Sequence, residues 1–196
     1  MQCAEKHRAI AKFITSELYA TEKSFYQFLL FVRSSYMEPM EKNSQNRTTL
    51  FRSNDDVYVL FYHLPDLVSV ASKMLYKLET YDFDDCPGLV IGRIFKELEQ
   101  DLVIFLKYAV HYRGHMKAIR RASHSARSNN KVEYNRLGLA DYLIAPFQRV
   151  PRYELLLNDL CKYATDQHED LIYARNMISS LAATMNQVQQ NISVNK

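Results

Sequence analysis

Glycine and proline are scarce in this sequence. Only four glycines and five prolines occur among 196 residues, and long stretches between them contain no helix-breaking residue. Folds rich in β-strands, and doubly wound folds, need turn residues at short intervals. The scarcity therefore argues against both classes and favours a chain that is almost entirely helical.

Cysteine is also rare, and long apolar runs are missing. Cys3, Cys86 and Cys161 are far apart and form no C-x-x-C or Cys/His pattern, so neither a disulfide framework nor a zinc site is indicated. No stretch approaches the roughly 18 apolar residues of a membrane span, and the N-terminus MQCAEKHRA has no hydrophobic signal region. We expect reduced thiols and a cytoplasmic protein.

Signatures of covalent catalysis and of metal binding are missing as well. The sequence has no glycine-rich phosphate loop and no G-x-S-x-G motif. Among six histidines, His111 and His115 form the only pair four residues apart, and no glutamate accompanies them in an H-E-x-x-H arrangement. We therefore expect no site for covalent chemistry, no metal and no cofactor.

The charge balance is mildly basic, with a formal net charge of +3 and a pI near 8.6. A basic run between residues 113 and 131 has charges that can track phosphates, but it lacks interleaved aromatic residues and no nucleic-acid-binding motif accompanies it. We interpret it as a solvated helix face or loop and expect no nucleic-acid partner. Its members are Arg113, Lys117, Arg120, Arg121, Arg127 and Lys131.

The length and a hydrophobic content of 47% fit one folded domain. From about residue 5 to 41 there is no glycine, and the only proline is Pro39, near the end. A helix of about 35 residues is roughly 50 Å long, too long for a compact globule, and predicts an elongated bundle. Apolar residues recur with helical spacing at Ile10, Ile14, Leu18, Phe25, Phe28, Val32 and Tyr36.

Polar and proline-containing stretches bound the next helices. Residues 54–56, Asn-Asp-Asp, are predicted to cap one helix, and Pro65 to open a further one that ends near Thr80. The polar stretch 41–49 is predicted to be a loop, and 81–88 the next break.

The second half of the chain is predicted to hold three helices. One runs from Leu89 to about residue 122, with Gly92 and Gly114 as weak points inside it, and a frayed end and loop follow at 123–133. The next covers 141–163, and 165–170 is its turn. The last carries the apolar seam of a bundle, at Ile178, Leu181, Met185, Val188 and Ile192.

The octet PFQRVPRY, residues 146–153, places two prolines inside the 141–163 helix. A proline in a helix interior costs about 3 kcal/mol because the carbonyl four residues earlier loses its donor. Gln148 and Arg152 share one helix face, and Arg149 and Tyr153 share the neighbouring one. The octet is either a surface helix with paired arginines or, as the strain favours, part of a functional groove.

Two further polar residues lie beside apolar stripes. Glu17 is at the edge of the stripe of the first helix, and Asn186 directly follows the seam residue Met185. Each taken alone is typical of a solvated or locally paired side chain.

Four stretches, in order along the chain, resemble the Dbl homology domain, the exchange module for Rho-type GTPases. The most specific is LADYLIAPFQRVPRYELLLNDLCKYA, residues 139–164, which fits nearly every position of the third conserved region of that family. SELYATEKSFYQFLL resembles the first region, IGRIF with the tyrosines that follow resembles the second, and ISSLAATMNQV resembles the closing helix.

The resemblance implies an all-α fold, an elongated bundle of about six principal helices with a kinked helix at 139–164. It also implies a face that grips the two switch regions of a GTPase. Glu17 is expected to hold switch I away from the nucleotide, and Arg152 and Asn186 to anchor switch II. These three residues are the predicted exchange residues.

Other residues receive supporting roles by the same resemblance. Thr21, Ile144 and Gln148 are expected to bind the GTPase, with Ile144 discriminating between GTPase subtypes. Arg149 and Tyr153 are expected to brace the bundle internally.

The function implied is guanine nucleotide exchange on a Rho or Rac GTPase, an activity without covalent chemistry. Because the resemblance covers the whole chain, we expect residues 1–196 to form a single Dbl homology domain, with no pleckstrin homology domain in this chain. Recruitment to the inner face of the plasma membrane is expected only through domains outside it.

Two alternatives stay open from the sequence. Ala145 stands where relatives often have lysine, and Phe25 where they usually have tyrosine, which motivates an exchange-inactive scaffold that binds a GTPase or another helical protein. The second alternative is a membrane-surface bundle that uses the basic run 113–131.

Overall fold

Helices make up nearly all of the chain in its computed structural model, which describes residues 2–43, 54–83, 86–128, 136–164 and 168–194. Within these residues there is no strand, and six helices have 11 or more residues, which confirms the predicted all-α fold. The elements are α1 (Gln2–Val32), η1 (Arg33–Met37), α2 (Glu38–Asn43), α3 (Asn54–Phe61), α4 (Leu64–Thr80), α5 (Pro87–Glu97), α6 (Glu99–Ser128), α7 (Arg136–Tyr163) and α8 (Glu169–Val194).

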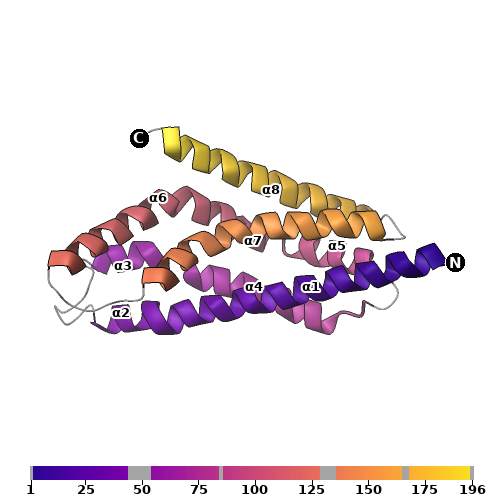
Figure 1. The fold of residues 1–196 in the computed structure, drawn as a ribbon, viewed down its shortest axis with the longest axis horizontal. Helices are drawn as coiled ribbons and strands as arrows, with labels where there is room; N and C mark the ends of the chain where they lie inside the picture. The colour runs from indigo at the N-terminus through magenta and orange to yellow at the C-terminus, as the bar shows by residue number, and fades with distance from the viewer. Residues whose placement is uncertain (1, 44–53, 84–85, 129–135, 165–167, 195–196) are drawn as a thin grey trace.

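The helices form an elongated bundle in which the long helices run side by side. Figure 1 shows α7 between α1 and α8, and these neighbours are in contact along α7. α1 also packs on α4, while α8 also packs on α5 and α6. The segment that carries the proline octet is therefore held between the first and the last helix.

The predicted first helix is present and continues through a π-helical turn. α1, η1 and α2 follow one another without a gap from residue 2 to 43. Ile14, Leu18, Phe25 and Val32 of the predicted stripe are buried, and the turn η1 brings Tyr36 into the same core. Such turns are rare, and the apolar spacing did not indicate this one.

The prediction of one helix from Leu89 to about residue 122 is wrong, because the chain turns at Leu98. This residue has φ −95° and ψ 4°, and it separates α5 from α6. Its side chain is buried, while its N–H still reaches the Ile94 carbonyl at 3.1 Å. The break lets α5 pack on α8 while α6 packs on both α8 and α3, and it falls at neither predicted weak point.

Gly92 has a packing role instead. A Cβ atom at this position would lie 2.5 Å from the Leu171 backbone nitrogen and 2.6 Å from the Asp170 carbonyl carbon, at the start of α8. The missing side chain is what lets α5 and α8 approach so closely.

Pro146 and Pro151 both lie inside α7, whose axis bends along the way in Figure 1. Pro146 has no N–H for the Tyr142 carbonyl four residues earlier. The buried Tyr108 hydroxyl of α6 donates to that carbonyl at 3.4 Å, so a side chain supplies the hydrogen bond that the proline removes.

The other boundaries follow the predictions with small shifts. α4 has Pro65 in its first turn and ends at Thr80, as predicted. Residues 54–56, the predicted cap, form the first turn of α3, and residues 41–43, predicted as loop, end α2. α6 extends to Ser128 and α7 begins at Arg136, so both are longer than expected, and residues 169–170 belong to α8 rather than to a turn. The predicted loop residues 44–49, 129–133 and 165–167 lie outside the described residues.

One continuous apolar core runs through the bundle, and its largest fully buried side chains include Tyr108, Tyr142, Tyr153, Phe95 and Phe105. No helix in the described part of the chain is long and apolar enough to cross a bilayer.

Candidate functional site on helices α1 and α7

α1 and α7 pack antiparallel, because residues later in α1 meet residues earlier in α7. This register brings together positions that are more than a hundred residues apart in the sequence. The contacts, in order along α1, are the His7 ring with the Tyr163 ring at 5.6 Å between centroids, Glu17 with Arg152, and Glu22 with Arg149 at 2.5 Å.

Glu17 and Arg152, two of the three predicted exchange residues, meet at the surface of this helix pair. A nitrogen of the Arg152 guanidinium donates to Oε1 of Glu17. The two side chains keep 31% and 44% of their surface exposed, so they remain accessible to a partner. An exposed pair of this kind contributes at most about 1 kcal/mol to stability. Stability alone is therefore a weak explanation for its presence.

The predicted GTPase-binding residues extend this surface along both helices. Ile144 and Gln148 are exposed on α7, two turns and one turn before Arg152. Thr21 follows Glu17 by one turn on α1, is partly buried, and donates its hydroxyl to the Leu18 carbonyl at 3.1 Å. We call the surface formed by Glu17, Arg152, Gln148 and Ile144 the α1/α7 face.

Asn186, the third predicted exchange residue, lies on α8. Its side chain is exposed, and the preceding Met185 is buried in the core. The contacts found among the described residues join Glu17 to Arg152 and do not join Asn186 to either, so its place on a common face stays a prediction.

Beneath the face lies a buried network of Glu22, Arg149 and Tyr153. Arg149 donates to Oε2 of Glu22 through Nε at 2.9 Å and Nη2 at 2.5 Å, and the Tyr153 hydroxyl donates to the same oxygen at 2.6 Å. The Arg149 guanidinium also lies 4.4 Å from the centre of the Tyr153 ring. Arg149 and Tyr153 thus brace the bundle from inside, as expected by resemblance.

The electrostatics of this network are those of a buried charge pair. Burial raises the pKa of the Glu22 carboxyl above its usual value, and the Arg149 guanidinium opposes that shift. Burial and the neighbouring carboxylate hold the pKa of Tyr153 well above its ordinary value. The second oxygen of Glu22 has no hydrogen-bond partner among the described residues.

Glu22 was missed by the sequence reasoning, although a signal was present. It lies between Leu18 and Phe25 on the apolar stripe of α1, where all three side chains are buried. A carboxylate in the middle of such a stripe indicates a buried cationic partner.

The departures from the family pattern are accommodated in the fold. The Phe25 ring is buried, and its centroid lies 6.2 Å from that of Phe105. Ala145 is half-buried and packs against the core. Neither position carries a polar group that the bundle leaves unsatisfied.

A cluster of histidines lies outside the face. His63, which precedes α4, approaches His111 of α6 with 3.0 Å between Nε2 and Nδ1, and the buried His115 ring lies 6.1 Å from the His63 ring. Burial lowers the pKa of His63 and of His115 to about 4. The sequence identified only the His111 and His115 spacing. The described residues include no group of three His, Cys, Asp or Glu arranged to hold a metal ion.

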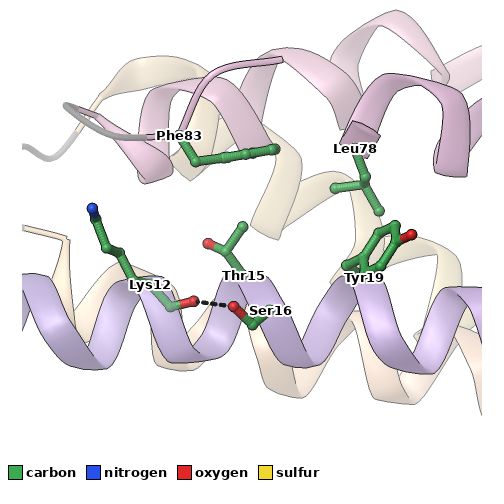
Figure 2. A pocket seen from close by; sticks show the side chains of 6 residues that line it. All are labelled: Lys12, Thr15, Ser16, Tyr19, Leu78 and Phe83. Carbon is green, nitrogen blue, oxygen red and sulfur yellow. Dashed lines mark hydrogen bonds between the residues drawn. The ribbon is translucent and has the colours of Figure 1, made fainter. Parts of the chain in front are cut away.

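A small groove of about 270 Å³ opens on another side of α1. Figure 2 shows Lys12, Thr15 and Tyr19 of α1 facing Leu78 of α4 and Phe83 across it, while the hydroxyl of Ser16, which also lines it, donates to the Lys12 carbonyl. The Tyr19 hydroxyl donates to Glu79 at 2.9 Å, which ties this side of α1 to α4. Glu17 does not line the groove, so the groove and the α1/α7 face are separate surfaces.

The basic run is exposed where its side chains are described. Arg113, Lys117 and Arg120 are exposed on α6, consistent with a solvated helix face. The side chains of Arg121, Arg127 and Lys131 lie outside the described part of the chain.

Comparisons with known proteins give the class of this fold. Autoinhibited Vav1 superimposes with a TM-score of 0.74 at 19% identity, covering 96% of this chain and 34% of that one. PDZ-RhoGEF, whose solved fragment is described as Dbl homology (DH) and PH domains, superimposes with a TM-score of 0.70 at 18% identity, covering 96% and 55%. The fold is that of a Dbl homology domain.

Sequence comparison assigns the chain to a family. The RhoGEF domain family matches residues 14–189. Guanine exchange factor for Rac 30 of Dictyostelium discoideum is 29% identical over 182 residues, which are 89% of this chain and 11% of that protein. The chain therefore belongs to the RhoGEF domain family, and it spans about a tenth of the length of this relative.

Proposed function

We propose that this chain is a guanine nucleotide exchange domain that binds the switch regions of a Rho or Rac GTPase and promotes release of GDP, so that GTP binds in its place. One observation carries the proposal. Glu17 and Arg152 are 135 residues apart in sequence and meet on an exposed face, and both fall in the motifs that mark the family.

Relatives support the choice of partner. The Dictyostelium protein is named as an exchange factor for Rac. The PDZ-RhoGEF structure is a complex with activated RhoA. A GTPase of the same class is the partner that we assign to the α1/α7 face.

An exchange factor breaks no covalent bond. It binds the nucleotide-free GTPase more tightly than the loaded form, and by linkage it weakens nucleotide affinity by the same factor. Every 1.4 kcal/mol of this preference is a tenfold change. The residues of the face therefore act by binding a rearranged GTPase.

Each proposed role follows from side-chain chemistry. The Glu17 carboxylate accepts hydrogen bonds from backbone N–H and hydroxyl groups of switch I, and bonds to a charged group are the stronger kind. Arg152 presents a planar set of donors to switch II, where many relatives have lysine. In the free domain these two side chains satisfy one another, and the GTPase must take over both.

Asn186 completes the proposed exchange residues from α8, as a second contact to switch II. Thr21, Gln148 and Ile144 are assigned to GTPase binding, with Ile144 exposed to read differences between GTPase subtypes. A cytoplasmic location, with membrane recruitment through domains outside this chain, stays a prediction.

Release of fluorescent GDP from a panel of Rho-type and Rac-type GTPases tests the proposal. Acceleration of release from at least one member is expected. Tight binding to nucleotide-free GTPase in a pull-down, without accelerated release, would identify an exchange-inactive scaffold instead. Binding to anionic vesicles with no effect on any GTPase would identify a membrane-surface bundle.

A further inference from the structure

Phe13 is an apolar side chain that the bundle does not use. It lies on α1 one turn before Glu17 and is 69% exposed, more than any other large hydrophobic side chain in the described residues. Because positions i and i+4 share a helix face, its ring projects on the same side of α1 as the Glu17 carboxylate.

Leu155 is the exposed apolar residue next to Arg152 on α7, as Phe13 is next to Glu17 on α1. It follows Arg152 by three residues, which keeps it near the same helix face, and it is 58% exposed. Later residues of α7 meet earlier residues of α1, as the contact of Tyr163 with His7 shows. Phe13 and Leu155 therefore lie at the same end of the Glu17 and Arg152 pair.

Leu155 also borders a groove toward α8 whose lining mixes apolar and charged side chains. Leu155 lines a groove of about 770 Å³ between the end of α7 and the start of α8, together with Ile172 and Arg175. Phe13 and Leu155 thus place two exposed apolar side chains beside the charged pair, as in interfaces whose polar anchors are shielded from water by surrounding contacts.

We propose that Phe13 is an affinity-determining contact of the exchange domain, with its ring buried against apolar side chains of the GTPase next to the switch region that Glu17 and Arg152 hold. Leu155 is its companion from α7. The inference rests on the proposed function and adds a residue that the sequence motifs did not single out.

The surroundings of Phe13 favour a protein partner over a lipid surface. Glu17 and Arg152 contribute one charge of each sign beside the ring. Anionic membranes are recognised by clusters of positive charge alone, whereas the charges of α1 around Phe13 are mixed, because Lys6 and Lys12 stand with Glu5 and Glu17. A mixed pair next to an exposed aromatic ring suits a partner that offers both charged and apolar groups.

The kinetic effect of Phe13 is expected in KM. Burial of its ring stabilises the complexes with loaded and with empty GTPase alike, and contacts made equally in both states change KM and leave kcat nearly constant. Loss of the ring therefore weakens encounter with the GTPase without removing the preference for the empty form.

The experiment compares Phe13→Ala with Tyr76→Ala, using the GTPase that responds most strongly to the wild type. Tyr76 is a matched control because it is an aromatic residue 68% exposed on α4. Phe13→Ala is expected to lower kcat/KM for GDP release about tenfold, mostly through KM, while Tyr76→Ala stays within twofold of wild type. Both variants are expected to unfold at the same urea concentration as wild type.

Three results overturn the inference while leaving the proposed function in place. The first is a kcat/KM of Phe13→Ala within twofold of wild type, and the second is an equal loss of kcat/KM in Phe13→Ala and Tyr76→Ala. The third is a wild-type dimer that Phe13→Ala dissociates without a change in exchange rate. If the wild type releases GDP from no GTPase of the panel, the proposed function fails first, and the inference fails with it.

Discussion

The Arg149 guanidinium and the Glu22 carboxylate are buried against each other across 127 positions of sequence, with Nε 2.9 Å and Nη2 2.5 Å from Oε2. Such a pair fits in only one register of α7 on α1. That register carries Arg152, three residues further on, to Glu17, five residues further back. The hidden pair therefore sets the position of the exposed one.

Removing only the arginine is expected to be costly. Arg149→Met leaves the Glu22 carboxylate buried with only the Tyr153 hydroxyl as a donor, and an uncompensated buried charge lowers the free energy of unfolding by about 3–5 kcal/mol. Combining Arg149→Met with Glu22→Leu is expected to restore much of that loss, because no charge then remains in the core. Urea denaturation measures both, and a single-variant loss below about 1 kcal/mol would show that the pair is not a buried anchor.

Gly92 of α5 and Gly114 of α6 are expected to respond in opposite directions to alanine. Gly92→Ala forces a methyl group into the backbone of Leu171, and overpacking of this kind costs about 1–3 kcal/mol. At Gly114 the nearest atom to a new Cβ is Val59 Cγ1 at 3.4 Å, so Gly114→Ala is expected to stabilise α6 by up to about 1 kcal/mol. Thermal unfolding of the two variants checks the contrast, which equal melting temperatures would contradict.

The buried histidines predict a loss of stability in mild acid. The pKa of His115 is lowered to about 4 because its ring is buried beside His63 and His111, while the unfolded chain protonates near its ordinary value of about 6.5. The stabilising preference for the neutral ring is fully present above pH 6.5 and is lost as the pH falls toward 4, by up to about 3 kcal/mol.

His115→Leu is the variant that isolates this effect. Both ring nitrogens of His115 are buried without hydrogen-bond partners in the described structure, so leucine is expected to be neutral or stabilising at pH 7. The unfolding free energy of the variant should fall less between pH 6.5 and 4 than that of wild type. Identical pH profiles for His115→Leu and wild type would exclude the buried ring as the source.

Much of the fold was predictable because helical spacing and breaking residues act locally. The stripe from Ile14 to Val32 and the proline at the start of α4 were sufficient to predict α1 and α4. The turn at Leu98 was not predictable, because neither glycine nor proline marks it and its cause is the packing of α5 and α6 on different neighbours. The π-helical turn η1 was not predictable either, because no glycine or proline marks it.

Some residues of the candidate site could be predicted from the sequence and others could not. Glu17 and Arg152 were identified by family motifs, since neither stands out by local chemistry alone. Glu22 and His63 were missed because their surroundings come from distant segments, α7 for Glu22 and α6 for His63. Phe13 was hidden for the opposite reason, since a sequence does not show which apolar residues remain exposed.

GDP release by three variants, measured on the GTPase that responds best to wild type, tests the central claim most directly. Glu17→Ala and Asn186→Ala are each expected to slow release at least about tenfold, a loss of at least about 1.4 kcal/mol of exchange-specific binding, with the unfolding free energy nearly unchanged. Lys73→Ala is the control, because it breaks an ion pair of similar exposure, that of Lys73 with Asp101. The GTPase should release GDP at the wild-type rate in its presence. Wild-type rates for Glu17→Ala and Asn186→Ala would contradict the account.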